Sequence, residues 1–194
     1  NAMKEDNIRN SSETIKSIAK IIGLSQNVAS KGVEQTLRDL NKEYLLDKTP
    51  EEALDVLISE YSEYGNTKDN YLAIDALSIT LKELEINTIE DLGHISIGDL
   101  LKEILINFID LNFKFRFEEQ ISKKSPSKAN EIMNSMSGYI KNKLRDELNT
   151  SNLENIDFNN LNNNRIIEDK IIEAYDIFRQ VYEEEWVLNE NMDK

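Results

Sequence analysis

Residues 96–120 read SIGDLLKEILINFIDLNFKFRFEEQ and contain, at 100–117, the longest strongly apolar stretch in this sequence of 194 residues. Apolar side chains recur in it every three to four positions, which is the spacing of a helix with buried faces. A helix of this length spans about 35 Å, the width of a whole small domain. Charged residues such as Lys102, Glu103 and Asp110 interrupt it, whereas a membrane-spanning helix needs about 20 largely uncharged residues. The stretch therefore predicts a long central helix that does not cross a membrane.

Helical signals continue on both sides of this stretch. Thr49, Pro50 and Glu52 form a capped helix start, since the Thr hydroxyl accepts from a free amide, Pro needs no donor there, and Glu bonds back to the Thr amide. Gly23 is a predicted stop for the first helix, and Gly32 is a weak point within the second. The expected helices cover residues 12–23, 25–44, 50–65, 67–85, 96–120, 126–148 and 165–188, with a short capped turn at 88–93.

Two connecting features complete this outline. The second helix is expected to carry an apolar face made of Val33, Leu37, Leu40 and Tyr44. Residues 149–164 are rich in Asn, which competes for backbone hydrogen bonds and favours turns, so a loop is predicted there. The side chains expected to hold this loop to the core are Leu153, Ile156 and Phe158.

No stretch alternates apolar and polar residues between turn signals, as a strand would. The sequence therefore predicts an all-α fold, a single helical bundle of six to eight helices with one long central helix. We expect residues 1–10 to be a tag remnant with a flexible N-terminus, and residues 11–190 to form one all-α domain.

Composition excludes several kinds of chemistry. The chain has no Cys and one His, so disulfides, thiolate zinc sites, Cys nucleophiles and multi-histidine metal sites are ruled out within it. His94 could act as a base oriented by Glu90 or Asp91, but a structural role in a loop is the preferred interpretation. Asp157 and Asn159 match two positions of a calcium loop whose turn glycine is missing. No phosphate-binding loop or nucleophile elbow occurs, so we expect no catalytic residue, cofactor or metal site.

Charge is unevenly distributed in this acidic chain, whose net charge is −14. Residues 51–100 contain 12 acidic and 2 basic residues, and residues 114–145 contain 8 basic and 3 acidic residues. Three interpretations stay open: the two regions face each other within the bundle, the acidic region binds a basic partner protein, or the basic region contacts nucleic acid. The basic side chains that would make a nucleic-acid or partner contact are Lys123, Lys124, Lys128, Lys141, Lys143 and Arg145.

Four segments together resemble a known bacterial family. They are GVEQTLRDLN at 32–41, TPEEAL at 49–54, DNYLAIDA at 69–76 and EAYDIF at 173–178. Their order and the long helix between them are similar to the QatB family of the Qat anti-phage defence system. The resemblance implies a role beside an ATPase, a protein like a queuosine-pathway nucleoside synthase, and a nuclease-like hydrolase. It supplies no catalytic or binding residue.

The expected function is that of a non-enzymatic helical interaction or adaptor subunit of a bacterial anti-phage defence complex, located in the cytoplasm. The alternative is a helical protein that contacts nucleic acid through residues 114–145. Trp186, among acidic residues near the end of the chain, either covers the bundle or anchors a partner protein.

Overall fold

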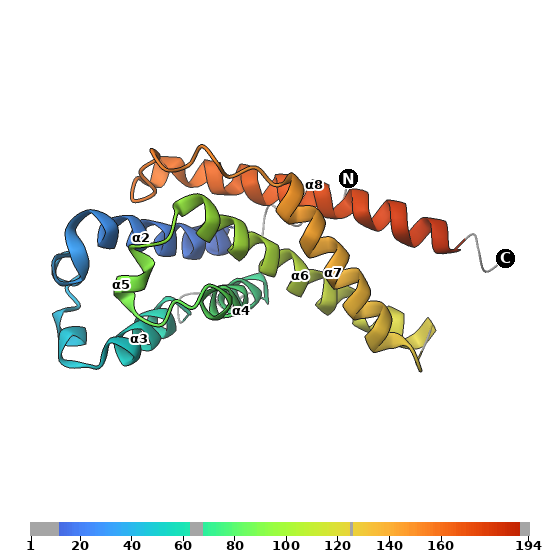
Figure 1. Cartoon of the computed structure of the whole chain (residues 1–194), viewed down its shortest axis with the longest axis horizontal. Helices are drawn as coiled ribbons and strands as arrows, with labels where there is room; N and C mark the ends of the chain where they lie inside the picture. The colour runs from blue at the N-terminus through green and yellow to red at the C-terminus, as the bar shows by residue number, and fades with distance from the viewer. Residues whose placement is uncertain (1–11, 63–67, 125, 191–194) are drawn as a thin grey trace.

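The computed structural model describes the backbone of residues 12–62, 68–124 and 126–190, and side chains within 13–61, 71–124 and 126–181 (Figure 1). Within these ranges the fold is entirely helical, with seven α-helices and no strand, which confirms the predicted all-α class. The expected segment 1–10 and the expected helix end at Gly65 lie outside them. The elements are α2 (Ser12–Asp39), η1 (Glu43–Asp47), α3 (Pro50–Ser62), α4 (Lys68–Glu83), α5 (Ile89–Leu92), α6 (Ile97–Lys124), α7 (Ala129–Glu147), η2 (Leu161–Asn163) and α8 (Asn164–Glu190).

Helix α6 is the predicted central helix, four residues longer at its end than expected. It packs against α2, α4, α7 and α8. In Figure 1, α8 runs along one side of the molecule, α3 and α4 lie along the other, and α6 runs between them. Helix α6 has buried side chains on most of its circumference and along most of its length. Leu100, Leu105 and Phe113 are examples, each at most 1% exposed. Residues from the other α-helices join them in one continuous hydrophobic core.

The predicted break at Gly23 is wrong, because α2 continues through it as a helix. A Cβ atom at Gly23 would lie 2.8 Å from Asn159 Oδ1, so glycine at this position leaves room for the Asn159 side chain against the helix. The helix instead breaks at Gly32, whose φ of 79° is in the left-handed region that favours glycine. The two arms of α2 therefore meet at Gly32.

Local capping signals correctly predicted the starts of α3 and α5, whereas the helix expected from residue 126 begins at Ala129. The Thr49 hydroxyl accepts a hydrogen bond from the Glu52 amide at 3.3 Å, and the Thr49 amide donates to the Glu52 carboxylate at 3.4 Å. Thr88 and Asp91 form the same reciprocal arrangement at α5. Hydrogen bonds from the Asn87 and Thr88 amides hold the pKa of Asp91 below its usual range. Each cap satisfies amides that have no partner within their own helix.

The predicted loop between α7 and α8 is present and is fastened to α2. Leu153 and Phe158 are 4% and 2% exposed, so the loop is held by its apolar side chains as expected. Gln26 adds a polar clamp: its side-chain amide donates to the Ile156 carbonyl at 2.6 Å and accepts from the Phe158 amide at 2.9 Å. An Asn-rich segment is thereby fixed against a helix distant in sequence.

The apolar face expected for residues 25–44 is only partly buried. Leu37 is 1% exposed, but Leu40 and Tyr44 are 36% and 47% exposed. The difference arises because α2 ends at Asp39, and Asn41 then adopts a positive φ of 56° that turns the chain. Leu40 and Tyr44 consequently lie beyond the helix whose periodicity placed them on one face.

Candidate interaction surfaces

The structure separates the six basic residues predicted as a contact surface into two groups. Lys123, Lys124 and Lys128 lie around the turn between α6 and α7, and the other three lie on the last turns of α7. Lys128 and Lys141 are 13 positions apart in sequence, which corresponds to about 20 Å along α7. The six side chains therefore do not form one patch.

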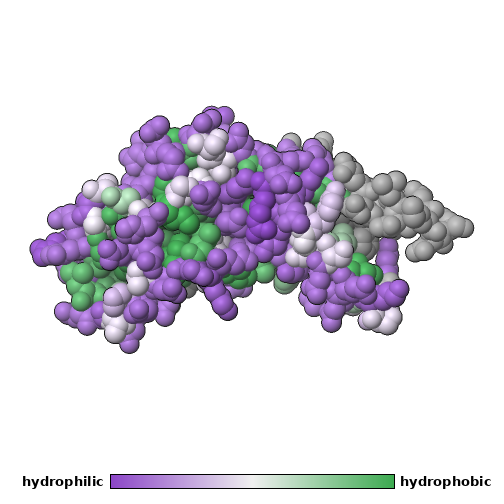
Figure 2. All heavy atoms as spheres, in the orientation of Figure 1, coloured by the Kyte–Doolittle hydropathy of each residue, from purple (hydrophilic) through white to green (hydrophobic). Residues whose placement is uncertain are grey.

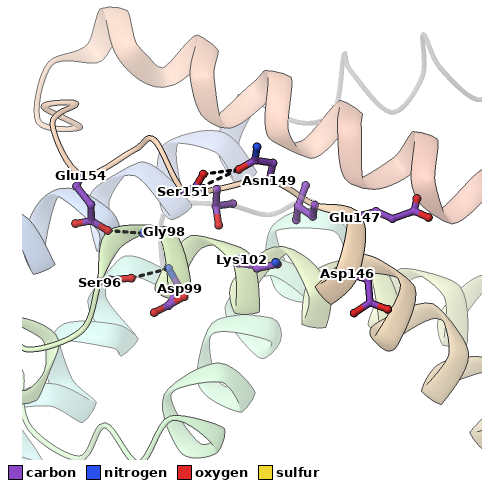
Figure 3. Close-up of a pocket in the computed structure, with 11 residues that line it drawn as sticks. Ser96, Gly98, Asp99, Lys102, Asp146, Glu147, Asn149, Ser151 and Glu154 are labelled. Carbon is purple, nitrogen blue, oxygen red and sulfur yellow. Dashed lines mark hydrogen bonds between the residues drawn. The ribbon is translucent and has the colours of Figure 1, made fainter.

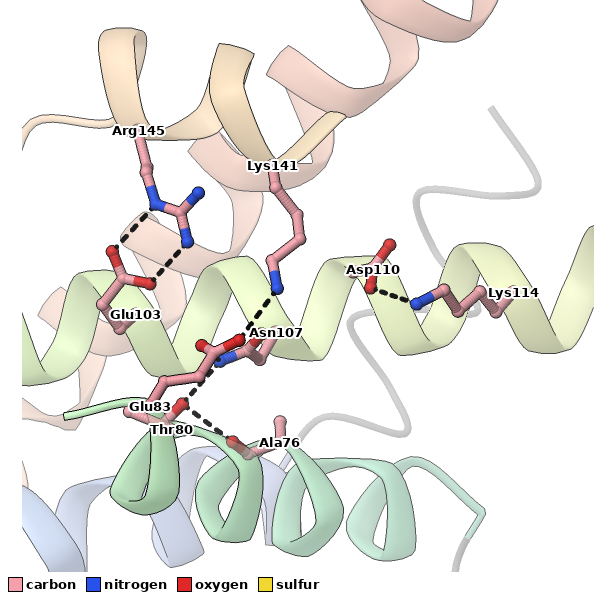
Figure 4. Close-up of polar contacts among 9 residues, drawn as sticks. All are labelled: Ala76, Thr80, Glu83, Glu103, Asn107, Asp110, Lys114, Lys141 and Arg145. Carbon is pink, nitrogen blue, oxygen red and sulfur yellow. Dashed lines mark hydrogen bonds and ion pairs between the residues drawn. The ribbon is translucent and has the colours of Figure 1, made fainter. Parts of the chain in front are cut away.

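Arg145 is joined to Glu103 of α6 by a two-pronged ion pair (Figure 4). The Arg145 Nε and Nη2 groups donate to the two carboxylate oxygens at 3.2 and 3.1 Å. This planar geometry matches guanidinium to carboxylate and is the strongest form of such a pair. The hydrogen bonds to Glu103 raise the pKa of Arg145, so this cation is already engaged within the fold.

Lys141 reaches a second carboxylate, that of Glu83 at the end of α4 (Figure 4). Glu83 accepts from Lys141 Nζ at 3.2 Å and from the Asn107 side chain at 2.9 Å, and Asn107 also donates to the Thr80 hydroxyl at 2.9 Å. Burial acts to raise the pKa of Glu83, but these donors outweigh it and lower the pKa. The network ties α4, α6 and α7 together, and it places part of the acidic region opposite part of the basic region.

Two of the other basic residues pair within their own helices. Lys123 bonds to Glu119 at 2.5 Å, and Lys143 bonds to Glu147 at 2.6 Å. Lys128 is exposed at the start of α7, and Lys124 is exposed near the end of α6. At least four of the six predicted contact residues are thus paired with carboxylates of this chain.

Asp110, three residues after Asn107 on α6, is a second buried polar residue of this helix (Figure 4). Its Oδ2 atom accepts from Lys114 Nζ at 2.8 Å, one turn later in the helix. Its Oδ1 atom has no hydrogen-bond partner in the part of the chain that the structure describes. Sequence reasoning treated this residue only as a charge that interrupts the apolar stretch.

A polar pocket of about 500 Å³ lies where α6 begins and α7 ends (Figure 3). On one side of the pocket the chain at Thr150 packs closely against Gly98. Only glycine fits there, because a Cβ atom at Gly98 would be 2.5 Å from the Thr150 carbonyl oxygen. The Gly98 amide donates to Glu154 at 3.1 Å, and the Asp99 amide donates to the Ser96 hydroxyl at 3.0 Å. The lining residues are Ser96, Gly98, Asp99, Lys102, Asp146, Glu147, Leu148, Asn149, Thr150, Ser151 and Glu154.

The chemistry of this pocket is mainly acidic, with four carboxylates and one lysine. Ser96 and Glu154 already occupy amides at the start of α6, so the positive end of that helix is partly neutralised by the chain itself. Among the side chains that the structure describes, no three His, Cys, Asp or Glu residues are placed to hold a metal ion. Sequence reasoning missed the pocket, although a glycine at the first turn of α6 was a signal of close approach.

The other two sequence candidates have different outcomes. His94 is exposed in the turn after α5, where its amide donates to the Asp91 carbonyl at 3.1 Å. Trp186 lies in the last part of α8, and its side chain is outside the described residues. Within the described helices, none has a run of apolar residues long enough to cross a membrane.

The comparison with protein families identifies a relationship over most of the chain. Residues 5–178 match the model of the QatB family, described as Qat anti-phage system associated protein QatB. No curated protein and no solved structure is detectably similar to the chain. The match covers the whole succession of elements from α2 into α8. By this match the chain belongs to the QatB family, a component of a bacterial anti-phage defence system.

Proposed function

We propose that this QatB-family protein acts as a non-enzymatic interaction or adaptor subunit that binds other proteins of the Qat system. Its partners would be drawn from the ATPase, the nucleoside-synthase-like protein and the nuclease-like hydrolase that the family resemblance implies. The complex would form in the cytoplasm. In this role the protein contributes surfaces that hold partners in place, while the reactions belong to the partners.

One contrast carries the proposal. Basic side chains of α6 and α7, among them Lys141 and Arg145, are paired with carboxylates of this chain, while several large apolar side chains are exposed. Exposed apolar groups in a folded chain favour protein contacts, because their removal from water stabilises a complex. The exposed large apolar side chains are Leu40, Tyr44, Leu46, Tyr71, Ile79, Phe115, Tyr139 and Leu161.

The nucleic-acid alternative has weaker support. Phosphate binding depends on cations that release counterions, and four of the six predicted basic residues pair with carboxylates of this chain. A net charge of −14 also repels a polyanion. This alternative would have to act through exposed basic side chains such as Lys124 and Lys128 at the α6–α7 turn.

Coexpression with the other Qat proteins tests the proposal. The protein is expected to purify with at least one of them and to elute with it in size-exclusion chromatography. A monomer that captures none of them would overturn the proposal. A second experiment uses labelled DNA and RNA in an electrophoretic mobility assay. A salt-sensitive mobility shift that is lost in Lys124→Glu and Lys128→Glu would favour the nucleic-acid alternative.

A further inference from the structure

The end of the molecule where α2 passes into α3 combines exposed apolar side chains with carboxylates. Its apolar members Leu40, Tyr44 and Leu46 are 36%, 47% and 44% exposed. Figure 2 shows green, hydrophobic surface at this end, on the left of the view. We call this region the η1 corner; it comprises these three residues and the nearby Glu43, Asp47, Lys48, Glu51, Glu52 and Asp55.

The geometry of η1 explains why these side chains face outward. In a 3₁₀ helix there are about three residues per turn, so one residue in three points toward the body of the protein. Leu45 takes that position and is 1% exposed. Tyr44 and Leu46, on either side of it, are consequently directed away from the core. The exposure of Tyr44 and Leu46 therefore follows from the 3₁₀ backbone conformation of η1.

The corner is also held in a fixed shape. Lys42 and the Tyr44 hydroxyl both donate to the carboxylate of Glu60 on α3. These hydrogen bonds lower the pKa of Glu60, so it is ionised and keeps its role as acceptor at neutral pH. A surface that is ordered before binding loses less conformational entropy when a partner docks. The apolar side chains of the corner are therefore presented by a rigid support.

The carboxylates of the corner are not neutralised by ion pairs. Glu43, Asp47, Glu51, Glu52 and Asp55 form no ion pair within the described residues, and Lys48 is the one basic residue among them. By contrast, the cations nearby on α2 are paired, Arg38 with Glu34 at 2.6 Å and Lys31 with Asp39. The charge that the corner presents to a partner is therefore strongly negative.

We propose that the η1 corner docks a basic surface of another protein of the Qat system, with apolar side chains of that protein packed against Leu40, Tyr44 and Leu46. This inference rests on the proposed function and adds to it the location of the contact and the chemistry of the partner. Nearby Lys or Arg side chains of the partner would face the carboxylates of the corner.

The same charge argues against other occupants. Nucleic acid and anionic lipid surfaces carry negative charge and are repelled by the corner. A second copy of this chain would have to place the same carboxylates against each other, because a symmetric dimer contact pairs one surface with itself. A protein surface that carries both basic and apolar side chains complements both the carboxylates and the apolar residues of the η1 corner.

Two variants test the two parts of the corner separately in the coexpressed full-length proteins. Leu46→Ala shortens an exposed apolar side chain, and Asp47→Lys combined with Glu51→Lys reverses charge. Each is expected to lower the amount of a Qat protein captured by about tenfold or more, the effect typical of a central interface residue. Thermal unfolding of Leu46→Ala, followed by circular dichroism, is expected to stay close to that of the wild type because this side chain is partly exposed. The charge reversal is expected to lower the unfolding midpoint slightly, because Glu51 lies in the first turn of α3, where a negative charge favours the helix.

Matched controls lie on other elements. Leu161→Ala shortens an apolar side chain that is 78% exposed on η2, and Glu131→Lys combined with Asp169→Lys reverses two exposed charges on α7 and α8. Both are expected to capture partners at the wild-type level, because the inference assigns docking to the η1 corner and not to the other exposed apolar side chains, Leu161 included. Equal losses in the controls and in the corner variants would overturn the inference, because the effect would then follow from overall charge or hydrophobicity.

The outcomes distinguish this inference from the proposed function. If the wild type captures Qat proteins and the corner variants capture them equally well, the docking site is wrong while the adaptor role stands. If the wild type captures none, the adaptor role itself fails. Light scattering of the protein alone gives a third arm: a dimer that Leu46→Ala converts to a monomer would assign the corner to a second copy and overturn the inference.

Discussion

Arg145 shows how one residue can suggest a binding surface in the sequence and serve the fold in the structure. Its guanidinium is held by both oxygens of Glu103, which is the more buried partner, with a side chain 19% exposed against 42% for Arg145. The pair connects the last turn of α7 to the first third of α6. Its partner is 42 residues away in sequence, so no local pattern indicated it.

The Arg145–Glu103 pair is expected to contribute to stability by a modest amount. Arg145→Ala should lower the free energy of unfolding by about 1 kcal/mol or less, because the pair is partly exposed to water. Arg145→Lys should recover less than half of the loss, since an ammonium cannot make the two-pronged contact. The coupling energy between the two side chains is measured by urea unfolding of Arg145→Ala, Arg145→Lys, Glu103→Ala and the two double variants that combine Glu103→Ala with each Arg145 change. A coupling energy of zero would show that the pair is incidental.

Glu83 makes stability depend on pH in a definite direction. Its pKa is lowered in the folded protein from an ordinary value of 4.5, so the folded state binds a proton less readily than the unfolded state. The resulting stabilisation is complete above 4.5 and is lost as the pH falls below it. Glu83→Gln should therefore be less stable than the wild type at neutral pH, and the two should converge on acidification.

Urea unfolding across a pH series measures this convergence. Glu131→Gln, on the exposed side of α7, is the control and should follow the wild type at every pH. A constant difference between Glu83→Gln and the wild type would mean that the carboxylate acts by its shape alone. Then Asn107 and Lys141 would not be the origin of its lowered pKa.

At the scale of elements, two glycines in helices have opposite roles. Gly32 has a φ of 79°, whereas Gly138 lies within α7, and a Cβ atom added at either position would have no neighbouring atom within 4 Å. Neither substitution by Ala therefore meets a steric clash, and the backbone alone determines the effect. Comparing the two Gly→Ala variants therefore measures the effect of backbone conformation without a contribution from side-chain packing.

Gly32→Ala and Gly138→Ala are expected to shift stability in opposite directions. Alanine at Gly32 must adopt a left-handed conformation, which should destabilise the protein by about 1–3 kcal/mol. Alanine at Gly138 gains helix propensity and should stabilise it by about 1 kcal/mol. Thermal or urea unfolding of the two variants measures both effects. A loss of stability in Gly138→Ala would contradict the assignment of α7 as an uninterrupted helix.

The same elements show what the sequence could predict. Thr49 with Glu52, and the apolar spacing of residues 96–120, are local signals, and they correctly predicted the start of α3 and the central position of α6. Gly23 and Gly32 look alike in sequence, yet only Gly32 breaks α2, while Gly23 stays helical and lies against Asn159 of the Asn-rich loop. That contact depends on a residue 136 positions away.

The candidate surfaces were less predictable for a related reason. The basic stretch was visible in the sequence, but the helix register that pairs Lys141 with Glu83 depends on how α4 and α7 pack on α6. The exposure of Tyr44 likewise depends on the turn at Asn41. Surface assignments from periodicity fail where a helix ends earlier than the apolar pattern does.

For the whole molecule, the dominant electrostatic fact is the net charge of −14. Repulsion among like charges destabilises a compact state, and salt screens it over a distance that falls from about 30 Å at 0.01 M to about 10 Å at 0.1 M. The thermal unfolding midpoint should therefore rise when sodium chloride is increased across this range. Calorimetry measures it. A falling midpoint would mean that the ion pairs between helices outweigh the overall repulsion.

The clamp between Gln26 and the Asn-rich loop has a consequence for how the protein is made. It joins backbone groups at Ile156 and Phe158 to a side chain that leaves the ribosome about 130 residues earlier. During synthesis α2 must therefore wait, with part of its surface uncovered, until most of the polypeptide has emerged. Contacts this distant in sequence form late, so the nascent chain is most vulnerable to proteases and misassociation before its last helix is complete.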